Sequence, residues 1–264
     1  MRTPLDSWAP ARRRLALVVL GTVVVLLVVL GAWAVVHALG GASQVDQRAQ
    51  GPVILVPGYG GDLEDLAPLQ AELEREGRTT VVFRPTDGEQ GDLRVQARRL
   101  AALARRTVQR SGAPSVDVVG YSAGGVITRL FVRDYGGDQV VRRVLTLGSP
   151  HHGTDVAQTA KDAAGGCPTA CEQLVPDSDL LDRLNAGDET PSGPRWITIR
   201  SDADEIVTPT DSAALIGALN LRIQDFCASS RTSHGDLPGD ALTLRALPVV
   251  LGQGAPHAPA PLHC

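Results

Sequence analysis

Aromatic residues, metal-binding motifs and basic segments are scarce in this chain, and each absence narrows the classes of protein that fit it. Aromatics are 3% of the 264 residues while hydrophobic residues are 43%, so the core must be built from Val, Leu, Ile and Ala. Residues 1–39 hold four Arg and one Asp, leaving 21 basic against 28 acidic residues elsewhere. An acidic body without a basic stripe argues against nucleic acid as a partner.

The four cysteines lack the spacing of a metal site. They are Cys167, Cys171, Cys227 and Cys264; none forms a Cys-x-x-Cys pair and no histidine cluster accompanies them. We therefore expect no metal. An even number of cysteines in an exported domain indicates disulfides, for which three pairings exist. We favour Cys167–Cys171, which closes a small loop, and Cys227–Cys264, which ties the tail to the body.

The N-terminus carries a long apolar segment. Arg12-Arg13-Arg14 precede Leu15 to Val36, an uncharged stretch of 22 residues. That length spans a bilayer core of about 30 Å, whereas the apolar region of a signal peptide usually has about 7–15 residues. We predict an uncleaved signal anchor with the arginines in the cytoplasm. The alternative is a long signal peptide, cleaved after Ala34 or Ala38; Arg13-Arg14 also hint at twin-arginine export. Every reading makes the body extracytoplasmic.

The rest of the chain indicates one α/β domain. Residues 1–39 are the stub and anchor, 40–50 a polar linker and 51–264 the domain, with a loosely patterned insertion at 154–194 that we expect to form a substrate rim or lid. We predict strands at 52–56, 79–83, 116–121, 140–147, 195–199 and 219–224, and helices at 63–75, 93–110, 178–185 and 237–251 and from residue 123. This alternation predicts a mostly parallel sheet with helices on both faces. We expect a monomer.

The segment Gly120-Tyr-Ser-Ala-Gly124 follows a β-branched run and precedes a helix. A strand that turns into a helix through Gly-x-Ser-x-Gly is typical of the nucleophile of serine hydrolases. The turn is tight and its backbone strained, so the close neighbours of the serine must lack side chains. We therefore predict that Ser122 is a nucleophile; the alternative is a glycine-rich connection with an exposed serine.

A serine nucleophile needs a base and an acid, which follow it in the order acid, then histidine, on loops after strands. Asp202, Asp204 and Glu205 all follow the strand that ends at residue 199. We favour Asp204, because it precedes Ile206-Val207, whose apolar side chains can anchor the loop; Asp202 is next.

His234 is the predicted base, because it follows the last predicted strand. The other histidines fit less well: His37 lies at the membrane end, His151 and His152 precede the acid, and His257 and His263 lie in the tail. Two backbone N–H groups must stabilise the oxyanion. We assign them to Ala123, after the nucleophile, and to Tyr59, in the glycine-rich loop after the first strand. Gly60 and Gly61 could equally be simple turn glycines.

Four segments resemble those of a known group of enzymes. They are Pro52 to Gly61, Gly120 to Gly125, Thr146 to Thr154 and Ser201 to Val207. Together they resemble small α/β-hydrolases of the bacterial secreted lipase/esterase group over residues 51–252. The first motif usually reads His-Gly-x-Gly-Gly, and Pro57 stands here in place of the histidine. The aspartate before an x-Ile-Val segment strengthens the choice of Asp204.

The resemblance implies a serine hydrolase that cleaves acyl esters, with lipid esters favoured, and requires no cofactor. It places His151 and His152 in a structural or rim role, and we expect Gly58, Tyr59, Tyr121 and His151 to contact substrate. The expected partners are a small-molecule or lipid ester and, through the N-terminal segment, the membrane. A thioesterase, acyltransferase or peptidase with the same residues is an alternative, as is a non-catalytic surface-binding protein with this fold.

Overall fold

The computed structural model describes residues 14, 18–29, 31, 45–86, 90–260 and 264. They fall into two units, residues 1–43 and residues 44–264. In the first unit residues 18–29 are helical. Within the described ranges, no helix is both long enough and apolar enough to span a bilayer. The predicted anchor at 15–36 includes residues 15–17, 30 and 32–36, which lie outside those ranges.

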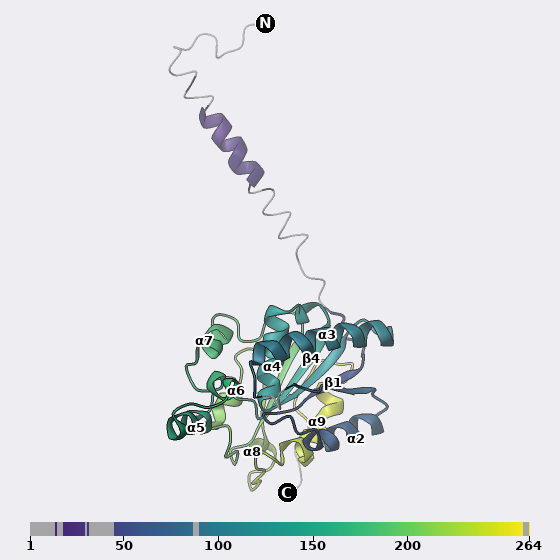
Figure 1. Cartoon of the computed structure of the whole chain (residues 1–264). Helices are drawn as coiled ribbons and strands as arrows, with labels where there is room; N and C mark the ends of the chain where they lie inside the picture. Colours follow the sequence, from purple (N-terminus) through teal and green to yellow (C-terminus); the bar gives the residue numbers. More distant parts are fainter. Residues whose placement is uncertain (1–13, 15–17, 30, 32–44, 87–89, 261–263) are drawn as a thin grey trace. The chain divides into compact units, whose positions relative to one another are not determined.

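The second unit is built on a sheet of six parallel strands among the described residues (Figure 1). Their order across the sheet is β2-β1-β3-β4-β5-β6. The chain therefore starts inside the sheet and winds outwards in both directions, which places helices on both faces, as predicted. The strands are β1 (Val53–Val56), β2 (Thr80–Val82), β3 (Val116–Tyr121), β4 (Val141–Leu147), β5 (Arg195–Arg200) and β6 (Leu219–Arg222).

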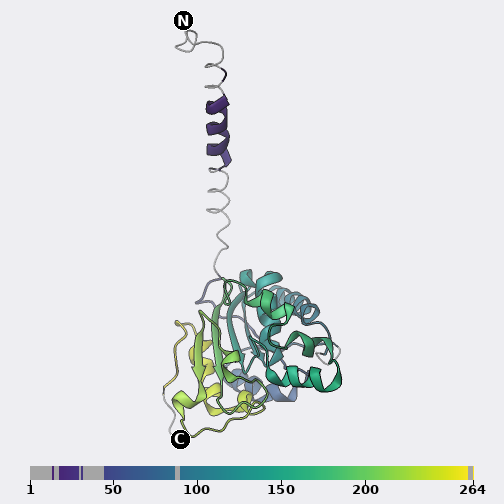
Figure 2. The same ribbon diagram turned by 90° about the vertical axis from the view of Figure 1, so that its left-hand side faces the viewer.

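Each face of the sheet has its own hydrophobic core. In β1, Val53 and Leu55 belong to one core and Ile54 and Val56 to the other, because successive side chains of a strand point to opposite faces. Two helices, α2 (Ala67–Arg75) and α9 (Ala241–Val250), cover the first face, and α3 (Leu93–Ser111) and α4 (Ala123–Asp134) cover the second. Figure 2 shows the sheet between these layers. Strands buried on both faces explain their near-continuous Val, Ile and Leu.

Side-chain caps fix where several helices begin. Asp92 caps α3, and Thr154 caps α5 (Asp155–Ala164), each by accepting a hydrogen bond from the backbone N–H two residues later. Gly112 and Gly165 end these helices in the left-handed conformation, with φ of 69° and 66°. The Asp62 carboxylate accepts the Glu64 N–H at 2.9 Å at the start of the short 3₁₀ turn η2 (Glu64–Leu66). Because this turn comes first, α2 starts later than residue 63, where we predicted it.

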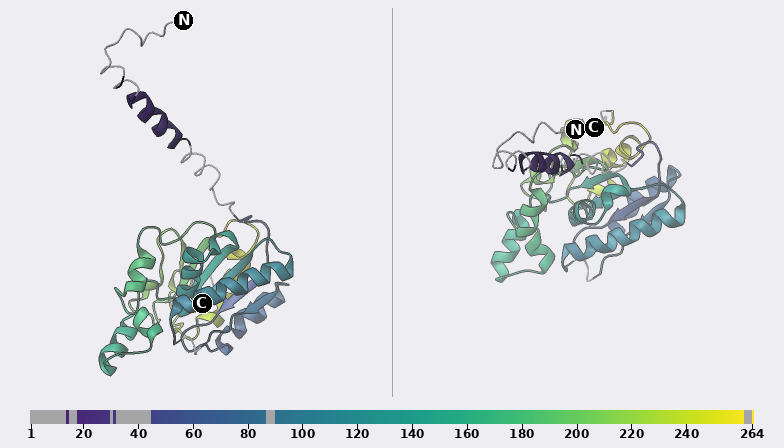
Figure 3. Two further views of the ribbon diagram at one scale, coloured as in Figure 1. Left: turned by 45° about the horizontal axis from the view of Figure 1, so that its top comes forward. Right: turned by 90° about the horizontal axis from the view of Figure 1, so that it is seen from above.

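The segment 154–194 contains three helices, where we predicted one. They are α5, α6 (Thr169–Gln173) and α7 (Asp179–Asn185), and they form a lobe beside the sheet, drawn in green in Figure 3. Only the last was visible in the sequence. The first is amphipathic, with Val156 and Ala157 on its apolar side, but its alanines give a weak pattern. The second has five residues, which is too short for a period to be read.

The C-terminal elements also differ from the predicted ones. β6 ends at Arg222 and continues directly into the short helix α8 (Ile223–Phe226). The predicted helix 237–251 is divided into the 3₁₀ turn η6 (Leu237–Gly239) and α9. Asp240 causes the division, because its carboxylate accepts the Leu242 N–H and starts a new helix. Two further 3₁₀ turns are η4 (Gly137–Gln139) and η5 (Thr210–Ala213).

A buried charge cluster lies at the amino ends of the strands. The Asp117 carboxylate is fully buried and accepts from Arg142 at 2.9 Å and from Arg78 at 2.7 Å. Arg142 also donates to the carbonyls of Gln47 and Gly252. Residues 45–50, which we predicted as part of a linker, are therefore bonded to the domain.

The described structure contains two disulfides, and the carboxyl ends of the strands lie opposite the charge cluster. Both favoured pairings are present, Cys167–Cys171 and Cys227–Cys264. All six strands are parallel, so their carboxyl ends meet at one edge of the sheet. The loops after β1, β3, β4, β5 and β6 carry the predicted site residues to this edge, where ligands of open α/β sheets bind.

Candidate active site

Ser122 lies at a strained turn between β3 and α4. Its φ is 52° and its ψ −126°, a backbone conformation that residues other than glycine rarely adopt. Its N–H donates to the Leu147 carbonyl at 2.8 Å, and its carbonyl accepts from Gly125 N–H at 3.0 Å. The turn is thus fixed to β4 on one side and to α4 on the other. These bonds hold the hydroxyl at the carboxyl edge of the sheet.

The two glycines of the motif are required by close backbone contacts. A Cβ on Gly120 would lie 2.7 Å from the backbone of Gly124 and Gly125, where α4 crosses the strand. A Cβ on Gly124 would lie 2.4 Å from the Pro57 carbonyl oxygen. The second contact brings the loop after β1 against the serine turn. Gly58 in that loop lies so close that a Cβ there would be 2.9 Å from Ser122 Cβ.

Ser122, His234 and Asp204 form a continuous hydrogen-bonded row. His234 Nε2 is 3.0 Å from Ser122 Oγ, and His234 Nδ1 is 2.7 Å from Asp204 Oδ2. All three residues are buried, with 5–8% of their surface exposed. A carboxylate can only accept, so Nδ1 carries the proton and Nε2 is left to accept from the hydroxyl. The sequence placed these residues 112 and 30 positions apart, and the fold brings them together.

The Asp204 carboxylate is held on both oxygens. While Oδ2 faces the imidazole, Oδ1 accepts the N–H groups of Ile206 at 2.9 Å and Val207 at 2.8 Å. Val207 is itself buried, so the x-Ile-Val segment anchors the acid loop as expected. Asp202 points elsewhere and pairs with Arg222 at 3.1 Å. The carboxylate of Glu205 accepts the backbone N–H of His234 at 3.2 Å and therefore supports the histidine loop.

His151 has the structural role, one of the two roles that we expected for it, and does not lie at the rim. Its side chain is fully buried, and its Nε2 is 3.1 Å from Thr146 Oγ1. Burial, with Arg129 nearby, holds the pKa of this imidazole well below its ordinary value, so the ring is neutral. His152 is half exposed and contacts Glu189 at 3.0 Å. His257 lies in the exposed tail, while His37 and His263 lie outside the described residues.

Tyr121 supports the histidine from behind. Its ring centroid is 5.2 Å from that of His234, and its hydroxyl donates to the His234 carbonyl at 3.2 Å. The side chain is 5% exposed, and burial raises the pKa of its phenol well above the ordinary value. We expected Tyr121 to contact substrate, but its contacts are with the histidine.

The two predicted oxyanion donors flank the serine. Ala123 is the first residue of α4, and Tyr59 follows Gly58 in a turn closed by the bond from Gly61 N–H to the Gly58 carbonyl at 2.9 Å. Gly60 and Gly61 have φ of 95° and 70°, which explains the glycines at both positions. Among the described residues, neither the Ala123 N–H nor the Tyr59 N–H donates to a protein group. Both are therefore available to a ligand.

An apolar cavity of about 240 Å³ opens beside Ser122. Its walls come from two sides: the loops at the strand ends and the inserted segment. Besides Ser122 it is lined by Tyr59, Pro150, Thr154, Val156, Ala157, Ala160, Cys167, Pro168, Cys171, Leu174, Ile206 and Val207. The insertion, where we predicted a substrate rim or lid, thus contributes part of this lining. Its individual wall residues were not recognised, because small residues such as Ala157 carry no signal in sequence.

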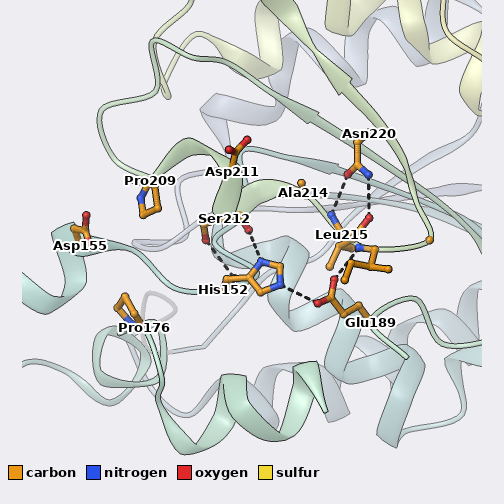
Figure 4. A pocket seen from close by; sticks show the side chains of 12 residues that line it. His152, Asp155, Pro176, Glu189, Pro209, Asp211, Ser212, Ala214, Leu215 and Asn220 are labelled. Atoms are coloured by element: carbon orange, nitrogen blue, oxygen red, sulfur yellow. Dashed lines mark hydrogen bonds and ion pairs between the residues drawn. The ribbon is translucent and has the colours of Figure 1, made fainter. Parts of the chain in front are cut away.

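A larger cavity, of about 620 Å³, lies around His152 and Glu189. Its principal polar groups already bond one another, as Figure 4 shows: His152 to Glu189 and Ser212, and Asn220 to Leu215. Glu189 uses its second oxygen on the Ile216 N–H at 2.7 Å. This network joins the end of the insertion to the loop after β5. Size alone therefore does not make this cavity the site, and the smaller apolar one contains the reactive group.

No set of three or more His, Cys, Asp or Glu side chains is arranged to hold a metal ion within the described ranges. The groups that meet at the edge of the sheet are the serine hydroxyl, an oriented imidazole, a carboxylate and two backbone N–H groups. These groups suffice for nucleophilic attack on a carbonyl carbon and for proton transfer to a leaving group.

Comparisons with known proteins agree with this chemistry. A profile of the palmitoyl protein thioesterase family matches residues 52–185, just over half of the chain. Two curated triacylglycerol lipases, from Pseudarthrobacter phenanthrenivorans and Burkholderia plantarii, are each 28% identical over 135 residues, or 47% of this chain. The matched region spans only 40% and 36% of these relatives.

Solved structures resemble the fold over a longer stretch. Lipase B of Aspergillus fumigatus has a TM-score of 0.69 at 20% identity, covering 78% of this chain and 54% of its own. A mature lipase of Bacillus licheniformis has a TM-score of 0.64 at 19% identity, covering 77% of this chain and 92% of its own. Both likenesses concern the arrangement of the backbone.

Proposed function

The chain belongs to the palmitoyl protein thioesterase family, within the lipase/esterase group of α/β-hydrolases, and we propose that it hydrolyses carboxylic esters through a covalent acyl-enzyme. The observation that carries this proposal is the row of hydrogen bonds from Ser122 through His234 to Asp204, at 3.0 and 2.7 Å. A nucleophile in contact with a base, which is oriented by a third group, is the arrangement needed for acyl transfer.

In the first half of the reaction, Ser122 Oγ attacks the ester carbonyl carbon while His234 Nε2 takes the hydroxyl proton. Asp204 keeps Nδ1 protonated and stabilises the imidazolium that forms. The carbonyl oxygen becomes an oxyanion, which the N–H groups of Tyr59 and Ala123 bind; the start of α4 adds its positive end to Ala123. Collapse of this intermediate expels the alcohol, which receives the proton from His234.

In the second half, water replaces the alcohol. His234 Nε2 takes a proton from water, whose oxygen attacks the acyl carbon, and the same two N–H groups stabilise the second oxyanion. The carbon–oxygen bond to Ser122 breaks, the serine oxygen recovers its proton from His234, and the acid leaves. The residues that carry these steps are Ser122, His234, Asp204, Tyr59 and Ala123, and no cofactor enters them.

The apolar cavity supports an aliphatic acyl group as the substrate's reactive part. Its lining is aliphatic apart from Tyr59, Ser122, Thr154 and the disulfide sulfurs, so a hydrocarbon chain gains burial there without leaving polar groups unpaired. Lipid esters therefore fit better than peptides. A thioester is the second candidate, favoured by the family, because its carbonyl is attacked in the same way.

An extracytoplasmic location is supported by the disulfides Cys167–Cys171 and Cys227–Cys264, since such bonds persist in oxidising compartments. The membrane as a partner through residues 15–36 stays a prediction, as does a monomeric state.

Hydrolysis of p-nitrophenyl octanoate by the full chain tests the mechanism. Ser122→Ala removes the nucleophile and is expected to lower kcat/KM by about 10⁴-fold or more. Ser115→Ala is the matched control: Ser115 is also buried but precedes β3, at the opposite edge of the sheet, so the activity of this variant should equal that of the unaltered chain. Equal rates for Ser122→Ala and the unaltered chain would reject the proposal. Octanoyl thioester turnover, measured in parallel, decides between the two acyl donors.

A further inference from the structure

The cavity beside Ser122 has a covalent element in its wall. Cys167, Pro168 and Cys171 all line it, and the two cysteines are joined, with their Cα atoms 5.8 Å apart. They belong to the inserted segment, whereas Ser122 and Val207 belong to the loops at the strand ends. The bridge therefore forms part of the cavity wall that the inserted segment provides.

The two halves of this wall are held differently. The Cys171 half is anchored, because α6 bonds to the start of α3: the Ala170 N–H donates to the Gln90 carbonyl at 3.1 Å, and Gln173 Oε1 accepts the Leu93 N–H at 2.9 Å. Cys171 is 8% exposed and its Sγ is 3.8 Å from the Ala157 carbonyl oxygen in α5.

The Cys167 half depends on the bridge. Cys167 follows Gly165 and Gly166, both with positive φ, and within the described part of the chain it makes no backbone hydrogen bond of its own. On one side of it the Gly166 N–H donates to the Lys161 carbonyl at 2.9 Å, and on the other the Pro168 carbonyl accepts the Glu172 N–H at 3.1 Å. Between these two bonds, the disulfide is the tether that keeps Cys167 against the cavity.

The cavity beside Ser122 has a volume of about 240 Å³. A methylene group takes about 30 Å³, close to water's share of liquid volume, so roughly eight chain carbons fill that volume. A palmitoyl chain has about twice as many carbons and would extend beyond it.

We propose that the Cys167–Cys171 bridge sets the length of acyl chain that the site prefers, by holding one wall of the cavity in a position that leaves room for a medium-length chain. This inference rests on the proposed ester hydrolysis at Ser122. It makes the bridge a determinant of specificity, which acts on the substrate tail and leaves the reacting atoms untouched.

The test compares p-nitrophenyl acetate, octanoate and palmitate with the full chain and two double variants. The unaltered chain should prefer octanoate. Cys167→Ser/Cys171→Ser should raise the ratio of the kcat/KM for palmitate to that for octanoate by about tenfold. A change of this size is typical when a pocket accommodates one or more additional methylene groups of the substrate. Cys227→Ser/Cys264→Ser, which removes the other disulfide, should leave the ratio unchanged. The inference is overturned if the ratio stays constant in both variants, or shifts equally in both.

A second pair of variants keeps the bridge and decides the matter if the first double variant does not fold. Ala160 lines the cavity and Ala163 does not, yet both are exposed on α5. Ala160→Leu should lower octanoate kcat/KM relative to acetate by about tenfold, whereas Ala163→Leu should leave that ratio unchanged. No difference between the two would contradict the assigned acyl path. Activity that survives Ser122→Ala would instead reject the proposed function itself.

Discussion

Tyr121 and His234 are joined twice, through rings 5.2 Å apart and tilted by 31°, and through the hydrogen bond from the phenol to the His234 carbonyl at 3.2 Å. The tyrosine ends β3 immediately before Ser122, so one strand end holds the proposed nucleophile and the support of its base. Ser122 and the tyrosine that supports His234 would therefore move together if β3 were displaced, which preserves the distance between Ser122 and His234.

Tyr121→Phe should keep the ring contact and remove the hydroxyl. The His234 carbonyl then loses one neutral hydrogen bond, typically worth about 1 kcal/mol, so we expect a lower Tm and a fall in kcat of about fivefold with little change in KM. Tyr135→Phe is the control, because Tyr135 lies at the end of α4, away from the site. A kcat unchanged by Tyr121→Phe would show that the phenol does not position the base.

Asp204→Asn should reduce kcat by about 10⁴-fold, because an amide cannot hold His234 in the tautomer that accepts at Nε2. Asp202→Asn should change kcat less than about twofold, since Asp202 forms only a half-exposed pair with Arg222, of a kind worth about 0–1 kcal/mol. Steady-state kinetics of the two variants separate the candidates. Comparable losses in both would remove the distinction that the geometry draws between these acids.

Gly148 lies directly beneath the acid–histidine pair, where a methyl group would be disruptive. Its φ is 50°, and a Cβ there would lie 2.5 Å from Leu237 Cδ1, 3.0 Å from Asp204 Oδ2 and 3.2 Å from His234 Nδ1. Gly148→Ala should lower stability by about 1–3 kcal/mol and also abolish most of the activity.

Gly136→Ala provides the matched control for that substitution. Gly136 has a φ of 75°, but a Cβ there meets no described atom within 4 Å, so only the conformational strain remains. Urea unfolding should detect a loss of about 1 kcal/mol with full activity. If both variants keep full activity, Gly148 does not constrain the pair.

His151 should make stability fall in mild acid. Burial lowers its pKa in the folded protein below the ordinary 6.5, so the unfolded chain binds a proton more readily. Stability from this residue is therefore complete above pH 6.5 and is lost as the pH falls toward the folded pKa, at a rate of at most about 1.4 kcal/mol per pH unit. Urea unfolding at pH 7.5, 6.5 and 5.5 measures the slope. His151→Gln, compared with the unaltered chain, should flatten it; parallel curves would assign the acid sensitivity to other groups.

Much of the fold could be predicted because its signals are local. The strand at 53–56 is a continuous apolar run, and the helix 93–111 has a capping aspartate and a terminal glycine. Ser122 was recognised for a similar reason. Its neighbours Gly120 and Gly124 are glycines because backbone atoms lie too close for a side chain, and these glycines form the local motif.

The features that could not be predicted from the sequence depend on contacts between distant segments. The apolar Ile206-Val207 and the resemblance favoured Asp204 over Asp202, but only the structure shows that the N–H groups of Ile206 and Val207 bind the Asp204 carboxylate. For His151 the resemblance left a structural and a rim role open, and the sequence could not decide between them. Its burial follows from packing against Thr146 and Asn185, which lie on β4 and α7.

The inserted segment was the least predictable part. α6 has only five residues, and its place is set by bonds to Gln90 and Leu93 some 80 positions earlier. Such long-range contacts leave no periodic pattern in the chain. The shape of the cavity, and hence the acyl group that it fits, therefore required the structure.

The bridge between Cys227 and Cys264 has a topological consequence for the base. These cysteines are 37 positions apart, and His234, η6 and α9 all lie between them. His234 consequently belongs to a covalent ring. A protease that cuts one peptide bond in an exposed part of this ring, such as residues 254–257, opens it without releasing a fragment. The histidine stays joined to the body through the backbone, and the disulfide retains the C-terminal piece beyond the nick.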